Sequence, residues 1–96
     1  MIDARRTVDA VWRIESARIV STLAKMTGDF GLAEDLAQEA VVDALAQWPV
    51  SGVPQNAGAW LTAVAKRKAI DGWRRRQRLD ERYRAMAHDL DEAGGG

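Results

Sequence analysis

The sequence predicts an all-α fold, a compact domain of three to four helices. Apolar residues recur at spacings of three and four in three separate stretches, and clusters of glycine, proline and aspartate separate those stretches. No run alternates polar and apolar residues as a half-buried strand would. The chain has 96 residues, enough for one small domain, and its 47% of hydrophobic residues fits a globular protein.

The first helix is expected from about Asp3 to Met26. One face carries its apolar residues, which are Val8, Val11, Trp12, Ile19, Leu23 and Met26. The stretch "TGDFG" (Thr27–Gly31) should end this helix, because two glycines and an aspartate disfavour its continuation. Asp29 is placed to cap the helix that follows.

The second helix is expected from about Gly31 to Trp48. On a helical wheel, small and apolar residues gather on one side: Ala33, Ala37, Ala40, Val41, Ala44 and Trp48, with Leu36 and Leu45 at the margins. The opposite side holds polar residues, namely Asp35, Gln38, Glu39 and Asp43. Val42 lies among these polar residues, so we expect it to be exposed.

Residues Pro49–Gly58, "PVSGVPQNAG", should form a loop, because two prolines and two glycines disfavour a helix across it. The third helix is expected to start near Ala57, after a cap by Asn56, and to reach at least Arg78. Its core stripe is predicted to contain Leu61, Val64, Ala65 and Ala69. Gly72 costs about 1 kcal/mol relative to alanine, so a bend or an end is expected there.

Beyond Arg78, apolar residues continue at helical spacing and predict a fourth helix or an extension of the third: Leu79, Tyr83, Met86 and Leu90. We therefore divide the chain into a helical domain, residues 1–78, and residues 79–96, a helical extension with a partly disordered linker or tail.

Composition excludes several classes of function. The chain has no cysteine, so disulfides and thiolate metal sites are excluded. No apolar run approaches the roughly 20 residues of a membrane helix, and the N-terminus does not read as a signal peptide, so a cytoplasmic protein without a membrane partner is expected. The single histidine, His88, has no metal-ligand spacing, and no phosphate loop or activated nucleophile is present. We expect no enzyme activity, catalytic residue, metal site or cofactor.

Charge is segregated along a chain whose formal net charge is zero. Residues 27–47 contain acids and no base: Asp29, Glu34, Asp35, Glu39 and Asp43. Residues 66–78 contain Asp71 and seven bases: Lys66, Arg67, Lys68, Arg74, Arg75, Arg76 and Arg78. Such blocks suggest two surfaces for two partners. Alternatively, the two blocks face each other inside one fold.

The basic stretch has the composition of a nucleic-acid surface. Arg67, Arg74 and Arg78 fall within about 40° on the wheel, and Ala63 and Trp60 share their face. A neighbouring strip contains Lys66, Ile70, Trp73 and Gln77. Arginines beside aromatic residues suit phosphate contact and stacking on an unpaired base. A solvated helix face without a partner is the alternative.

The four tryptophans divide into two pairs. Trp12 and Trp48 lie on core stripes and are expected to anchor the core. Trp60 and Trp73 lie near the arginines, and each is a candidate for stacking on a base.

The acidic face of the second helix lacks compensating charge. Asp35, Glu39 and Asp43 follow one another at spacings of four, and like charges so placed destabilise a helix by about 0.2–0.5 kcal/mol per pair. Basic residues from elsewhere in the fold, or from a basic partner, must offset the repulsion between these acids. The exposed Val42 favours a protein partner, since protein contacts combine an apolar centre with a polar rim.

Two blocks resemble region 2 of bacterial RNA polymerase sigma factors of the extracytoplasmic-function type. "AEDLAQEAVVDALAQW" (Ala33–Trp48) is similar to the family's acidic helix, and "AWLTAVAKRKAIDGWRRR" (Ala59–Arg76) to the helix of the next two subregions. Both blocks occur in the family's order, separated by a similar Pro/Gly loop. The resemblance spans about Val11 to Arg78.

The resemblance implies two binding surfaces. The acidic helix would contact the clamp helices of the largest subunit of RNA polymerase core through Asp35, Gln38, Glu39 and Val42. The third helix would bind the non-template strand of the promoter −10 element, and the loop Val50–Gly58 would receive a flipped base. The implied DNA-binding residues are Asn56, which would read the base, Lys66, Arg67, and, for the strand backbone, Arg74, Arg75, Arg76 and Arg78. To these we add Trp60, the stacking candidate argued above.

Departures from the family accompany the resemblance. Many relatives have asparagine where Arg67 stands, a glycine such as Gly72 is unusual in mid-helix, and no helix-turn-helix follows. The chain is therefore expected to be the first domain of a longer factor. Further expected partners are an anti-sigma factor and a second copy of the isolated domain. The alternative is a helical interaction or dimerisation module without DNA binding, whose charge blocks pair across its interface.

Overall fold

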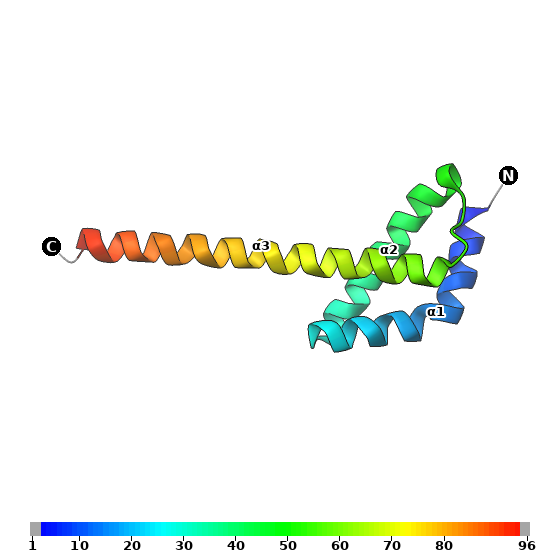
Figure 1. Ribbon diagram of the computed structural model, residues 1–96, viewed down its shortest axis with the longest axis horizontal. Helices are drawn as coiled ribbons and strands as arrows, with labels where there is room; N and C mark the ends of the chain where they lie inside the picture. The colour runs from blue at the N-terminus through cyan, green and yellow to red at the C-terminus, as the bar shows by residue number, and fades with distance from the viewer. Residues whose placement is uncertain (1–2, 95–96) are drawn as a thin grey trace.

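The computed structural model describes residues 3–94, and within them it contains three α-helices and no strand (Figure 1). These are α1 (Ala4–Thr27), α2 (Phe30–Ser51) and α3 (Ala57–Gly94). The predicted all-α class is confirmed. The helix α2 crosses between the other two, and α3 projects alone far beyond them, so the molecule measures 69 × 27 × 16 Å.

Both helix junctions are fixed by side chains that the sequence places there. The Asp29 Oδ1 accepts a hydrogen bond from the Leu32 N–H at 3.0 Å, and the Asn56 Oδ1 accepts one from the Ala59 N–H at 3.0 Å. Both predicted caps are confirmed. Gly28 ends α1 with φ 72°, a left-handed conformation that glycine adopts without steric cost.

Replacing Asn56 with alanine should lower the free energy of unfolding by about 1 kcal/mol, because the cap of α3 is lost. Asn56→Asp puts a carboxylate oxygen where the amide oxygen accepts the hydrogen bond, and it should retain most of the stability. Urea denaturation followed by circular dichroism measures both variants. Equal stability of the two variants would show that this cap does not hold the start of α3.

The core is formed by large side chains from all three helices packed against an alanine stripe of α2. The largest fully buried side chains are Trp48, Ile19, Leu23, Leu61 and Val8. The buried alanines are Ala33, Ala37, Ala40 and Ala44 of α2 and Ala65 of α3. Leu36 is also buried, and Val11, Val41, Val64 and Ala69 are half-buried against the core. Small side chains on α2 let the other helices approach closely, so most of the predicted core is confirmed.

Met26 is an exception, and its assignment to the core is wrong. Its side chain is 44% exposed in the last turn of α1. There it lines a surface pocket with Ile70 and Trp73 of α3, at the edge of the bundle. The periodicity of α1 continues to this turn, but the neighbouring side chains of α3 leave the pocket open and do not bury Met26.

The loop predicted over Pro49–Gly58 is too long. The helix α2 continues to Ser51 with Pro49 inside it, and the loop is confined to residues 52–56. Proline removes one N–H donor from the last turn. The remaining contacts of that turn persist, since the Ser51 hydroxyl donates to the Gln47 carbonyl at 3.0 Å and the Gly52 N–H donates to the Trp48 carbonyl at 2.9 Å.

The helix α3 does not end at Gly72. A penalty of about 1 kcal/mol is too small to stop a helix with strong helix formers on both sides. A Cβ added at Gly72 would meet no side chain or neighbouring element within 4 Å, so close packing does not require glycine there. The extension predicted after Arg78 is therefore the continuation of α3 to Gly94, while residues 95 and 96 lie outside the described range.

Candidate functional site

The predicted protein-binding residues form an exposed acidic patch on α2, which we define as Asp35, Gln38, Glu39 and Val42. All four are exposed, and Val42 is 63% accessible. Within the described residues, neither Asp35 nor Glu39 makes an ion pair. The patch thus places an apolar side chain among uncompensated negative charges.

Asp43, the third acid on that face of α2, has its negative charge compensated within the fold. The Lys68 Nζ lies 3.1 Å from the Asp43 Oδ2, and both side chains are about one-third exposed. This pair joins α2 to α3. The acidic and basic blocks therefore face each other at this one described pair, as the alternative interpretation expected. Asp35 and Glu39 of the acidic patch make no such contact within the described residues.

Arg67, Arg74 and Arg78 are exposed along α3, and we name them the basic ridge. Arg75 and Arg76 are also exposed, but at about 100° per residue Arg75 lies at the edge of the ridge, about 60° from Arg78, and Arg76 points to the opposite side. Arg76 lines the pocket beside Asp29 and Leu32. The arginine run is therefore spread around α3 and does not form one face.

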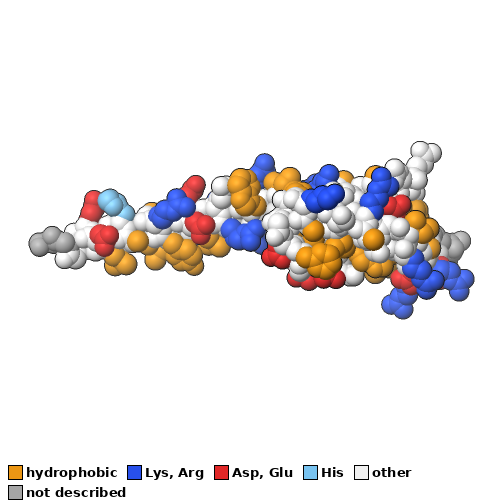
Figure 2. Space-filling view, turned by 90° about the horizontal axis from the view of Figure 1, so that it is seen from below, with side chains coloured by type: hydrophobic (Ala, Val, Ile, Leu, Met, Phe, Trp, Pro, Cys, Tyr) orange, Lys and Arg blue, Asp and Glu red, His pale blue; other side chains and the backbone are white. Residues whose placement is uncertain are grey.

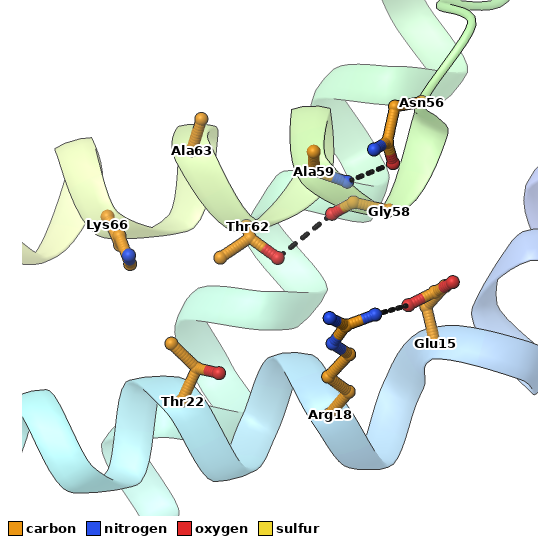
Figure 3. A pocket seen from close by; sticks show the side chains of 9 residues that line it. All are labelled: Glu15, Arg18, Thr22, Asn56, Gly58, Ala59, Thr62, Ala63 and Lys66. Atoms are coloured by element: carbon orange, nitrogen blue, oxygen red, sulfur yellow. Dashed lines mark hydrogen bonds and ion pairs between the residues drawn. The ribbon is translucent and has the colours of Figure 1, made fainter.

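Lys66 and Arg67 are neighbours in sequence but line different hollows. Arg67 borders a pocket of about 270 Å³ together with Trp60 and the Asp43–Lys68 pair. Lys66 lines a pocket of about 420 Å³ between α1 and the start of α3 (Figure 3). Ala63 borders both pockets and is exposed between them.

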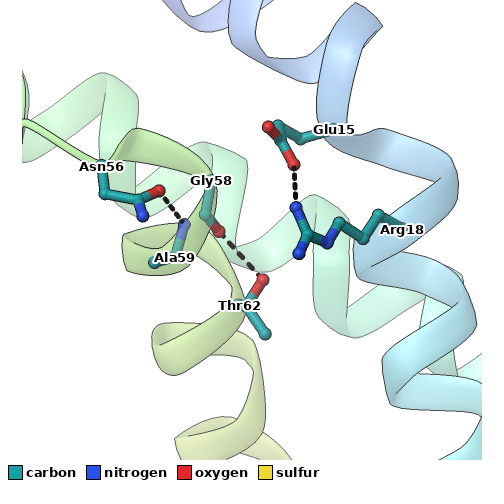
Figure 4. Close-up of polar contacts among 6 residues, drawn as sticks. All are labelled: Glu15, Arg18, Asn56, Gly58, Ala59 and Thr62. Atoms are coloured by element: carbon teal, nitrogen blue, oxygen red, sulfur yellow. Dashed lines mark hydrogen bonds and ion pairs between the residues drawn. The ribbon is translucent and has the colours of Figure 1, made fainter.

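We call the hollow beside Lys66 the α1–α3 pocket. It is lined by Glu15, Arg18, Thr22, Asn56, Gly58, Ala59, Thr62, Ala63 and Lys66. The cap occupies the Asn56 carbonyl oxygen, which leaves its amide N–H groups to donate elsewhere. Glu15 and Arg18 approach each other at 3.9 Å, a weak pair with an exposed arginine (Figure 4). The pocket offers donors and one carboxylate acceptor.

Glu15 and Arg18 are pocket residues that the sequence did not reveal. Gly58 is buried beneath Glu15, and a Cβ on Gly58 would lie 2.7 Å from the Glu15 Cδ. The glycine therefore permits the close approach of α1 to the start of α3. The sequence signal for this contact was Gly58, a glycine in the first turn of a helix. A glycine there indicates a close contact but does not identify Glu15 as the residue that makes it.

The four tryptophans divide as predicted for the core pair, Trp12 and Trp48, while the two stacking candidates differ from each other in exposure. Trp48 is fully buried, as predicted, and Trp12 is half-buried against the core. Trp60 is half-buried because its ring packs edge-on against Trp48, with centroids 5.4 Å apart and an interplanar angle of 66°. Trp73 is 55% exposed. Of the two stacking candidates, Trp73 presents the larger free surface.

Two classes of site receive no support from residues 3–94. The described helices include none with the length and apolarity needed to cross a membrane. The same residues contain no cluster of three or more metal-ligating side chains.

Comparison with known proteins assigns the chain to a family. The family model described as Sigma-70 region 2 matches residues 12–79, which is more than half of the chain. A Mycobacterium tuberculosis protein named "Probable ECF RNA polymerase sigma factor SigI" is 36% identical over 86 residues, 88% of this chain and 29% of its own length. An uncharacterized protein of Rhizobium meliloti is 38% identical over 74 residues, 65% of this chain and 18% of its own length. No solved structure matches.

The chain thus spans less than a third of the length of these relatives. The match covers most of α1, all of α2, the loop and the basic part of α3, the elements that carry the acidic patch, the basic ridge and the α1–α3 pocket. The resemblance seen in the sequence is confirmed: the chain belongs to the Sigma-70 region 2 family, and its similarity to the relative named SigI agrees with the extracytoplasmic-function type.

Proposed function

We propose that this chain is the domain of a transcription initiation factor that binds the RNA polymerase clamp and melts the promoter −10 element. The acidic patch on α2 would bind the clamp helices of the largest subunit, and α3 would bind the non-template strand. One observation carries this proposal: Asp43 and Lys68 are the described residues that pair between the two charged helices, and they leave both the acidic patch and the basic ridge exposed.

The basic ridge supports the DNA half of the proposal. From Arg67 to Arg78 it extends about 16 Å along the helix axis. Binding of such a row of arginines to phosphates releases the counterions of the DNA, and this contribution to affinity does not depend on the base sequence. Trp73, exposed at the edge of the same helix, offers an aromatic face on which an unpaired base can stack.

The α1–α3 pocket is our candidate for the site of a flipped base. Extruding a base costs a few kcal/mol, which contacts in a pocket must offset. The Asn56 amide and the Lys66 ammonium can donate to carbonyl or ring-nitrogen acceptors on the base. Glu15 can accept from an exocyclic amino group. The pocket therefore supplies both kinds of polar partner that a base edge requires.

The double variant Arg67→Ala/Arg74→Ala tests the DNA half. Single-stranded DNA releases about 0.7 counterions per phosphate contact, so loss of two contacts should make the negative slope of log K against log salt shallower by about 1.4. Binding of mixed-sequence single-stranded DNA by the complex with core polymerase, measured by fluorescence anisotropy across a salt series, gives this slope.

The matched control is Arg5→Ala/Arg13→Ala, which removes two exposed arginines from α1. Its salt slope should equal that of the unmodified chain. A slope unchanged by loss of Arg67 and Arg74 would mean that the basic ridge does not contact the strand.

A further inference from the structure

The projecting part of α3 carries an apolar row that no described residue covers. We name Leu79, Tyr83, Met86 and Leu90 the α3 stripe. Their exposed fractions are 39%, 63%, 53% and 70%. Figure 2 shows hydrophobic side chains gathered along one edge of the projecting helix. The spacings of four, three and four residues are those of the a and d positions of a coiled coil.

The α3 stripe continues the face of α3 that packs into the core. Leu79 lies about five helical turns after Leu61, and Tyr83 about five turns after Ala65. Leu61 and Ala65 are fully buried against α1 and α2. The core face of α3 thus extends past the bundle, where α1 and α2 no longer cover it (Figure 1).

We propose that the α3 stripe of one copy packs antiparallel against the same stripe of a second copy. The pairing is centred between residues 84 and 85. Leu79 then meets Leu90 of the second copy, and Tyr83 meets Met86, a favourable sulfur–aromatic contact. Both pairs occur twice by symmetry, so all four layers of the contact are apolar.

The position of the bundle decides the orientation. Because α1 and α2 cover the same face of α3 that carries the stripe, a parallel pair would bring two bundles between the two helices at one end. Two helices packed 8–10 Å apart leave no room for them. An antiparallel pair places the bundles at opposite ends, where each meets the projecting helix of the other copy.

Charge favours the same orientation. Arg82 and Asp89 lie one heptad apart on one flank of the stripe, so the antiparallel pair sets each Arg82 opposite Asp89 of the second copy. A parallel pair would instead bring the two arginine runs side by side.

The contact is compatible with the other surfaces of the molecule. On the helical wheel, Arg74 and Arg78 lie more than a quarter turn from the centre of the stripe, so the basic ridge remains free in the pair. The helix also exists before association, because the bundle already anchors its first turns, and the cost of helix nucleation is avoided. The proposal is therefore independent of the DNA-binding and polymerase-binding proposals.

Sedimentation velocity of the 96-residue chain tests the association. With four apolar layers, we expect a dimer with a Kd on the order of 10–100 µM. Met86→Glu should raise this Kd at least about tenfold, because it places a charge in the centre of the contact. Ala85→Glu adds the same charge one position away, on the other side of the helix, and should leave the Kd within about twofold.

Crosslinking tests the orientation, because the chain lacks cysteine and accepts single ones. When equal amounts of Leu79→Cys and Leu90→Cys chains are mixed with a short bis-maleimide, the mixed product should clearly exceed the two self-linked products combined, whereas random linkage would make the two amounts equal. A chain that stays monomeric at several hundred micromolar, a Kd insensitive to Met86→Glu, or a majority of self-linked product would overturn the proposal. So would a monomeric chain whose polymerase binding is lost in Met86→Glu, which would assign the stripe to the polymerase.

Discussion

Replacing Trp48 with alanine is expected to lower the free energy of unfolding by about 3–5 kcal/mol. Trp48 is the largest fully buried side chain, and it supports the ring of Trp60 at 5.4 Å. Its removal leaves a cavity where α2 meets the start of α3. Native proteins have about 5–15 kcal/mol of stability, and small domains lie at the low end, so the variant should be largely unfolded at 37 °C.

Two matched variants make this result specific. Trp48→Phe keeps an aromatic ring and removes the buried Trp48 Nε1, which has no hydrogen-bond partner among the described residues, so it should cost less than half as much. Trp73→Ala removes an exposed tryptophan and should change stability by no more than about 0.5 kcal/mol. Urea denaturation measures all three. Equal losses for Trp48→Ala and Trp73→Ala would contradict the packing described above.

The second large effect is expected on protein binding. Glu39→Arg should weaken binding of the chain to core RNA polymerase by at least about a hundredfold, since like charges placed together at an interface cost several kcal/mol. Glu39 lies at the centre of the acidic patch, exposed and without an ion pair among the described residues. Its reversal should therefore leave the fold intact.

The control for this variant is Glu34→Arg. Glu34 is an exposed acid of the same helix, but it faces α1 and lines a groove with Trp12 and Phe30. The same change of charge there should leave the affinity within about threefold. Binding to immobilised core polymerase measures both. If both variants lose affinity equally, binding follows net charge and not the acidic patch.

The sequence predicted most of the fold because its signals are local. The alanine stripe of α2 and the apolar face of α1 follow from helical periodicity, and Asp29 and Asn56 follow from capping chemistry. The errors have the same origin. Pro49 disfavours a helix locally, but the last turn of α2 keeps its other hydrogen bonds. Met26 continues the apolar period of α1 into its last turn, where α3 lines an open pocket beside it and does not bury it.

The candidate site was predicted less completely, because it depends on contacts between distant segments. Exposure of the acidic patch follows from its place on the polar side of α2. The Lys68–Asp43 pair and the approach of Glu15 to Gly58 join residues far apart in sequence, which periodicity does not specify. The helical wheel, which needs only the sequence, placed Arg67, Arg74 and Arg78 on one face.

The central claim is that two separate surfaces address two different partners, and crosslinking within one promoter complex tests it most directly. A photoreactive amino acid would replace Gln38 in the acidic patch or, in a second sample, Ala63 between the two pockets beside Lys66 and Arg67. We predict that the probe at position 38 links to the largest polymerase subunit and the probe at position 63 to the non-template strand. Linkage of both probes to the same partner, or of position 38 to DNA, would contradict the account.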